Sequence, residues 1–212
     1  MPRLLNIRCL LLLSLLFFAG INSACAEQMV LIQGYLGKPA NWVEAGIVRV
    51  LNNRGWRFGG EFYQSSDGVR LYQPATLTDE EKKRFYHVAL PTEASVQIQA
   101  FYLGRYLGFL RARYPAQSIT LVGHSAGGVV ARYAMVKNPS LEIDRLITIA
   151  SPHLGTESAA LGKLVGESPL GMIAPLMGAG TLNRSQGLYR DLMPENSNRM
   201  LYWLNRQPHP DA

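Results

Sequence analysis

Short apolar segments alternate with longer amphipathic ones along the chain, and this alternation restricts the possible folds more than any other feature of the sequence. Strands are expected at 29–33, 85–90, 119–122 and 146–150, and helices at 41–54, 94–114, 128–137 and 196–205. The strand segments are short and apolar almost throughout, which is typical of strands that are buried on both faces. The pattern therefore predicts an α/β fold with a mostly parallel sheet and helices on both of its faces.

The composition favours one domain and argues against a nucleic-acid partner. With 48% hydrophobic residues, the chain has enough apolar surface to build a core. No linker interrupts 27–212, so we interpret that range as a single domain. The net charge is +6, but the basic residues are scattered and form no stripe interleaved with aromatic residues. We therefore expect no nucleic-acid binding.

The first 26 residues have the pattern of a secretory signal peptide. Basic residues precede a short apolar run, and Ala24-Cys25-Ala26 offers a small-x-small cleavage site. We expect cleavage before Glu27 and export to the periplasm or the extracellular space, and the alternative is a lipoprotein acylated on Cys25. Because Cys9 and Cys25 would leave with this segment, the mature protein would have no disulfide, thiolate metal site or cysteine nucleophile.

The motif Gly123-His124-Ser125-Ala126-Gly127 lies between a predicted strand and a predicted helix. A G-x-S-x-G pattern in that context is typical of a nucleophile elbow. The sharp turn strains the central residue, and a Cβ two positions before or after it would clash. The helix N-terminus behind the serine supplies N–H groups for a developing oxyanion. We therefore predict that Ser125 is the catalytic nucleophile, and the alternative is a glycine-rich turn with an idle serine.

A second motif, Gln33-Gly34-Tyr35-Leu36-Gly37, follows the first predicted strand. Acyl transfer needs two backbone N–H donors beside the tetrahedral oxygen. We expect one donor to be the N–H of Ala126 and the other the N–H of Tyr35, because Gly34 lets the backbone approach closely. The alternative is an ordinary glycine turn that ends a strand.

Together these segments resemble the lipase and esterase branch of the α/β-hydrolase family. Residues 32–37 resemble the oxyanion loop of that family, and 121–128 resemble its nucleophile elbow. Residues 149–156 resemble a Ser-Pro-His-x-Gly-Thr signature, and 191–194 resemble a segment that follows the lid. The resemblance covers about 29–207. One departure from the family pattern is Gln33, which stands where many members have histidine.

The resemblance implies hydrolysis of a carboxylic ester, small or lipidic, through an acyl-enzyme at Ser125 and without a cofactor or metal. It also implies a lid, for which 154–185 is the candidate because this stretch is nearly uncharged and rich in Gly, Ala and Leu. Peripheral contact with a lipid surface stays open. Acyl transferases and thioesterases use the same elbow, so they are alternatives, as is a non-catalytic protein that binds an acyl ligand or a partner.

The acid and the histidine that complete such a site are not evident in the sequence. The family order is nucleophile, acid, histidine, with the last two on loops after further strands. We find no convincing strand after Ala150, so we expect the fold to lack its last strands, and we favour truncation over a base assembled from other residues. Asp191 and His209 satisfy the chain order but lie in polar surroundings, and His153 is expected to brace a strand end.

Overall fold

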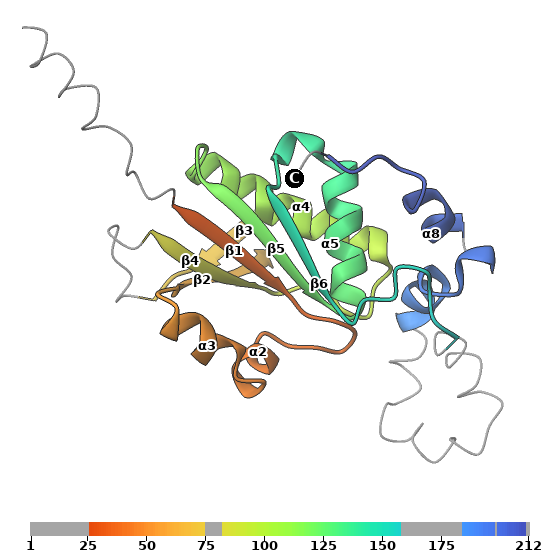
Figure 1. The fold of residues 1–212 in the computed structure, drawn as a ribbon, viewed down its shortest axis with the longest axis horizontal. Coiled ribbons are helices and arrows are strands. Elements are labelled where there is room, and N and C mark those ends of the chain that lie inside the picture. Colours follow the sequence, from red (N-terminus) through yellow and green to blue (C-terminus); the bar gives the residue numbers. More distant parts are fainter. Residues whose placement is uncertain (1–25, 75–81, 158–183, 198, 211–212) are drawn as a thin grey trace, which may run out of the picture.

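The computed structural model describes residues 26–74, 82–157, 184–197 and 199–210, and its centre is a six-stranded sheet in the order β3-β2-β4-β1-β5-β6 (Figure 1). The strands are β1 (Glu27–Ile32), β2 (Arg57–Ser65), β3 (Gly68–Tyr72), β4 (Lys83–Val88), β5 (Ser118–His124) and β6 (Arg145–Ile149). Neighbouring strands are parallel except in the β2–β3 hairpin. The prediction of a mostly parallel sheet is therefore confirmed.

Helices cover both faces of this sheet. The described ranges contain the α-helices α2 (Ala40–Glu44), α3 (Ile47–Asn53), α4 (Val96–Arg113), α5 (Ala126–Lys137) and α8 (Arg199–Leu204). Two 3₁₀ turns, η1 (Pro139–Leu141) and η4 (Glu195–Ser197), lie between elements, and residues 184–191 are also helical. In Figure 1, α4 and α5 lie on one side of the sheet, and α2 and α3 lie on the other. No helix within the described ranges combines the length and the apolar character needed to cross a bilayer.

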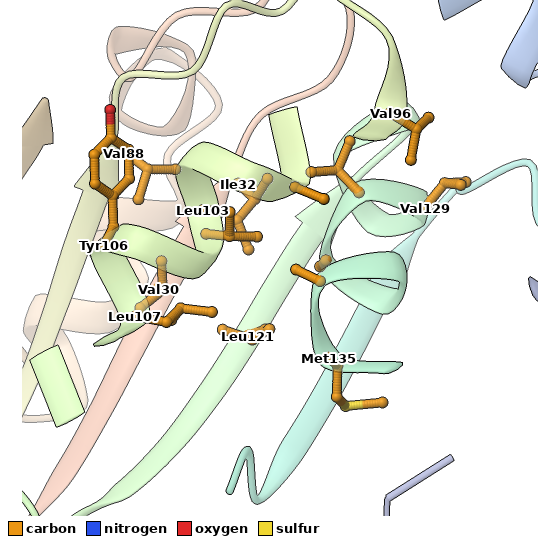
Figure 2. Close-up of a cluster of buried hydrophobic side chains, with 14 of the residues drawn as sticks. Val30, Ile32, Val88, Val96, Leu103, Tyr106, Leu107, Leu121, Val129 and Met135 are labelled. Atoms are coloured by element: carbon orange, nitrogen blue, oxygen red, sulfur yellow. The ribbon is translucent and has the colours of Figure 1, made fainter. Parts of the chain in front are cut away.

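The larger core lies between the sheet and the pair α4 and α5 (Figure 2). Val30 and Leu121 from the central strands meet Leu103 and Leu107 from α4, and Val129 from α5 completes the contact. These side chains are at most 1% exposed. Each buried aliphatic side chain of this kind contributes about 1.5–3 kcal/mol relative to its exposed state. This face of the sheet is therefore the firmly packed one.

The smaller core lies under α2 and α3. Leu31, Trp42, Trp56, Phe85 and Val122 form it. The segment predicted as one helix over 41–54 is two short helices, because Gly46 adopts a left-handed conformation with φ 76° between them. The first of them, α2, begins one residue before the predicted start, with Pro39 as its N-cap. Asn41 accepts a hydrogen bond from the N–H of Lys38 and donates one to Glu44.

The β2–β3 hairpin was not predicted from the sequence. Its two-residue turn is Ser66-Asp67, with Gly68 as the first residue of β3, and its strands mix polar and apolar residues without a clean alternation. A register shift between Phe58 and Gly60 breaks the alternation further. The predicted signal peptide falls almost entirely outside the described residues, and so does most of the predicted lid.

Candidate active site

Ser125 occupies a strained turn between β5 and α5. Its φ is 52° and its ψ is −128°, a conformation that residues with a side chain rarely adopt. The turn is held from both sides, because the N–H of Ser125 donates to the carbonyl of Ile149 (2.8 Å) and its carbonyl accepts from the N–H of Gly128 (3.1 Å). The side chain is half-buried at the carboxyl edge of the sheet. This is the backbone geometry that the G-x-S-x-G motif predicts.

The glycines of the motif are required by close backbone contacts. A Cβ on Gly123 would lie 2.4 Å from the Cα of Gly128, and a Cβ on Gly127 would lie 2.4 Å from the carbonyl oxygen of Gln33. A Cβ on Gly128 would lie 2.0 Å from Oγ of Ser151. Any side chain at these three positions would force the strand, the helix or the neighbouring loop to move. The turn is therefore fixed sterically against the ends of β1 and β6.

The loop after β1 passes directly over the serine. A Cβ on Gly34 would lie 2.8 Å from Cβ of Ser125 and 3.4 Å from its Oγ. The N–H of Gly37 donates to the carbonyl of Gly34 (3.0 Å), which closes the loop. Ala126 is the first residue of α5, so its N–H has no acceptor within that helix. The structure thus brings together the three residues that the sequence nominates, Ser125, Tyr35 and Ala126.

The side chain of Tyr35 ties this loop to the helix at 184–191. Its hydroxyl donates to Oγ of Ser185 (3.1 Å) and shares a 2.6 Å hydrogen bond with the hydroxyl of Tyr189. The two rings meet edge to face with their centroids 5.4 Å apart. Burial, followed by the hydrogen bond with Tyr35, raises the pKa of Tyr189 above its ordinary value, so its hydroxyl stays protonated. Sequence reasoning missed this contact because no local pattern links positions 150 residues apart.

Gln33 joins the ends of β1 and β4. Its side chain is 4% exposed, and its Nε2 donates to the carbonyl of Val88 (2.8 Å). Its Oε1 is buried without a hydrogen-bond partner among the described residues. A glutamine at this position therefore anchors the base of the loop that crosses Ser125.

A pocket of about 450 Å³ opens beside the serine. Its walls come from the loop after β1, from the two short helices and from the ends of β5 and β6: Gln33, Gly34, Tyr35, Leu36, Gly37, Asn41, Trp42, Ala45, Ile47, His124, Ser125 and Ile149. Most of this surface is apolar. Trp42 meets His124 edge to face, with their ring centroids 6.5 Å apart. The volume and the apolar lining suit a small ester or part of an acyl chain.

No histidine among the described residues is hydrogen-bonded to the Ser125 hydroxyl. His124 faces the same pocket, but its ring packs against Trp42. His87 is buried between Phe58 and Phe85. Burial lowers the pKa of His87 to about 4, so it stays neutral at ordinary pH.

The pair Asp191 and His209 has other partners. Asp191 is buried and accepts from the N–H of Val96, which caps the start of α4. Burial raises the pKa of Asp191 above its ordinary value. His209 is exposed, and its Nε2 accepts from Nε of Arg132 (2.7 Å). The structure therefore gives no support to these two residues as partners of Ser125.

His153 braces the end of β6 through its backbone rather than its ring. Its N–H donates to the carbonyl of Ser151 (2.9 Å), and its carbonyl accepts from Nδ2 of Asn205 (2.9 Å). Nδ1 of the ring is buried without a hydrogen-bond partner among the described residues. Burial, with the nearby charges of Arg132 and His209, lowers the pKa of this imidazole. Within the described ranges, no cluster of three His, Cys, Asp or Glu side chains could hold a metal ion.

The sequence around this turn is similar to a known domain type. A model for a PGAP1-like alpha/beta domain matches residues 87–163. A GPI inositol-deacylase of Cryptococcus neoformans var. neoformans is 35% identical over 83 residues, which are 37% of this chain and 11% of that protein. The chain spans about a tenth of the length of the curated relatives that it matches.

Comparison of structures shows the same architecture over most of the chain. The mature lipase BlEst2 of Bacillus licheniformis has a TM-score of 0.57 at 16% identity, covering 91% of this chain and 63% of that one. Phospholipase PlaB of Legionella pneumophila has a TM-score of 0.51 at 16% identity, covering 84% and 35%. With its parallel sheet and strand–turn–helix at Ser125, the chain has the α/β-hydrolase fold, as the sequence predicts.

Proposed function

We propose that this protein is a serine hydrolase that cleaves carboxylic esters, with lipid esters as the favoured class and Ser125 as the nucleophile. One observation carries the proposal: Ser125 is held in a strained turn at the mouth of an apolar pocket, with the Gly34 backbone almost in contact with it. An idle serine would not need such a conformation, which costs about 1–3 kcal/mol. The names of the similar proteins, a deacylase, a lipase and a phospholipase, support the same reaction class.

The proposed reaction has two steps. Oγ of Ser125 attacks the ester carbonyl while its proton passes to a base, and the tetrahedral oxyanion accepts hydrogen bonds from the N–H groups of Tyr35 and Ala126. The carbonyl re-forms, the C–O bond breaks, and the alcohol leaves with a proton. Water then attacks the acyl-enzyme, which releases the carboxylic acid and restores the serine hydroxyl. The acyl group lies in the pocket lined by Trp42 and Ile47.

A second candidate is a non-catalytic protein that binds an acyl ligand in the same pocket. The observation that favours it is that, in the part of the chain that the structure describes, no imidazole is hydrogen-bonded to Ser125. A neutral serine hydroxyl is a poor nucleophile without a base. This candidate predicts saturable binding of a fatty acid, no turnover, and no effect of Ser125→Ala on binding.

Labelling with a fluorophosphonate separates the two candidates. The purified protein, the Ser125→Ala variant and a Ser151→Ala control are reacted with the probe, and the modified peptide is identified by mass spectrometry. The hydrolase proposal expects labelling of Ser125 in the first and third proteins and a loss of about 10⁴-fold in ester turnover in the second. Failure of Ser125 to react, together with ligand binding that Ser125→Ala leaves unchanged, would reject the hydrolase in favour of the binding protein.

The proposal places this reaction outside the cytoplasm, as the N-terminal sequence predicts. Fractionation of cells that express the full chain checks this point, with N-terminal sequencing of the recovered protein. We expect a mature protein that begins at Glu27 in the periplasm or the medium, and recovery of uncut protein in the cytoplasm would contradict it.

A further inference from the structure

The outer face of α4 carries an apolar stripe that no described element covers. Ile98 is 50% exposed and Phe101 is 62% exposed, and Phe109 on the same helix is 38% exposed. Ile98, Phe101, Arg105 and Phe109 follow one another at spacings of three or four residues, so their side chains lie along one face. The opposite face of α4 packs into the larger core. A helix that is apolar on both faces normally has a second partner.

The charges on this helix have one sign. The whole of α4, from Val96 to Arg113, contains no acidic residue, and Arg105 and Arg113 are exposed on it. Arg111 is instead turned onto backbone carbonyls and pairs with Asp144. The guanidinium of Arg105 lies 5.9 Å from the centroid of the Phe101 ring, so the positive charge sits beside the exposed aromatic side chain. Arginine beside aromatic and aliphatic side chains is the composition of surfaces that bind anionic lipid interfaces.

The acidic residues around the start of α4 do not offset this charge. Glu93 is ion-paired with Arg184, with both carboxylate oxygens accepting from the guanidinium at 3.0 and 3.1 Å. Asp191 is buried against the N–H of Val96.

Two more arginines lie beside the first turn of the helix. The exposed residues Arg190 and Arg199 line a hollow of about 580 Å³ together with Ser95, Gln97 and the buried Asp191, so the hollow carries two arginines against one carboxyl group. The positive surface therefore extends from the outer face of α4 around its N-terminal end.

The position of the helix suits an enzyme that works at a lipid surface. Seven residues separate the end of β4 from the start of α4, so the N-terminal half of α4 lies toward the carboxyl edge of the sheet. Ser125 follows the carboxyl end of β5, at the same edge. The helix at 184–191 joins the two regions, because Tyr189 contacts Tyr35 and Gly187 lies close to Ser95.

We infer that the outer face of α4, defined by Ile98, Phe101 and Arg105, is a docking surface for an anionic lipid interface. The apolar side chains enter the boundary between head groups and acyl chains, and Arg105 with its neighbours pairs with lipid phosphates. Charge argues against a second copy of this chain as the occupant, since two such faces would bring arginine against arginine. The surface is independent of the chemistry at Ser125, so it can be tested even if that serine does not react.

Vesicle sedimentation tests this surface. The full chain is mixed with phosphatidylcholine vesicles and with vesicles that also contain phosphatidylglycerol, at low and high salt. We expect binding to the anionic vesicles that salt weakens, and a loss of affinity of about tenfold for the double variant Ile98→Ser with Phe101→Ser. Arg105→Gln is expected to weaken binding to the anionic vesicles by about fivefold and to leave any binding to phosphatidylcholine unchanged.

A matched control lies on the opposite side of the molecule. Val50 on α3 is 54% exposed, so Val50→Ser removes a similar exposed apolar group and should leave vesicle binding unchanged. Equal binding by the wild type and the double variant would overturn the inference. Retention on immobilised polyglutamate that Phe101→Ser weakens, without binding to either vesicle, would overturn it in favour of an acidic protein partner. Where ester turnover is measurable, the double variant should hydrolyse a short water-soluble ester at the wild-type rate.

Discussion

The two faces of the sheet are covered to different extents. On one face, α4 and α5 are 18 and 12 residues long and bury side chains such as Leu103 and Leu121 completely. On the other face, α2 and α3 have five and seven residues and leave Ile147 and Ile149 on β6 47% and 40% exposed. One face is therefore held by close packing, and the pocket beside the serine opens on the other, thinly covered face.

The Ser125 turn lies where these two regions meet. Its helix, α5, belongs to the packed face, and its pocket belongs to the thin one. The cost of the strained backbone at Ser125 is offset by packing on the first face, which leaves the second face free to accept a ligand. The predictions below test this division, beginning with the largest effect.

The largest effect is expected from Gly127→Ala. The new Cβ would meet two backbone carbonyl oxygens, at 2.4 Å from Gln33 and 2.6 Å from Ile32, and neither can rotate away. We expect a loss of more than about 3 kcal/mol in the free energy of unfolding, measured by urea denaturation. Gly108→Ala is the control, because nothing lies within 4 Å of its added Cβ, and it should stabilise α4 by about 0.5–1 kcal/mol. Similar midpoints for the two variants would refute the steric account of the turn.

The next prediction compares the stability lost when a side chain is truncated on each face of the sheet. Leu103→Ala on the packed face should cost about 2–5 kcal/mol, because the side chain is fully buried and the helix cannot collapse around the gap. Ile147→Ala on the thin face should cost less than about 1 kcal/mol, because nearly half of that side chain is already exposed. Unfolding midpoints of the two variants measure the contrast, and equal losses would show that β6 is covered by something beyond the described residues.

A third effect is the pH dependence that His87, on the thin face, gives to the free energy of unfolding. Its pKa is about 4 when folded, against about 6.5 in an unfolded chain, because burial among Phe58 and Phe85 disfavours the cation. As the pH falls below about 6.5, the imidazole is protonated in the unfolded chain but not in the folded one, which favours unfolding. The stability contributed by the neutral His87 is therefore complete above about pH 6.5 and is lost as the pH falls toward about 4. The loss in the free energy of unfolding should be about 3 kcal/mol near pH 4.

Urea denaturation at a series of pH values measures this loss. His87→Phe should flatten the pH dependence of the wild type between about pH 6.5 and 4. His153, whose pKa is also lowered, contributes in the same direction in both proteins. The quantity to follow is therefore the difference between them, and parallel curves would mean that His87 is not protected from protonation.

The packed face and the serine turn could be predicted from the sequence because their determinants are local. Apolar periodicity located α4 and α5 to within two residues at each end, and the glycine spacing around Ser125 fixed the strained turn. The thin face was predicted less well. The break at Gly46 looks like any other glycine in a helical segment, and β2 and β3 lack a clean alternation. The contacts of Tyr35 with Ser185 and Tyr189 span about 150 positions and have no local signal.

The smallest effect is expected at this Tyr35 contact, where hydrogen bonds add to the packing of the Tyr35 ring against the larger core. Tyr35→Phe removes the bonds to Ser185 and Tyr189 but keeps the ring and the backbone N–H. We expect a loss of about 1 kcal/mol in the free energy of unfolding. If Ser125 is the nucleophile, its fluorophosphonate labelling should slow by less than about tenfold, because the oxyanion donor is still present but its loop is less well ordered.

Tyr72→Phe is the control, since Tyr72 is 64% exposed and its substitution should change stability by no more than about 0.5 kcal/mol. A Tyr35→Phe protein as stable as the control would show that the loop is positioned by ring packing and the Gly34–Ser125 contact, without a contribution from these hydrogen bonds.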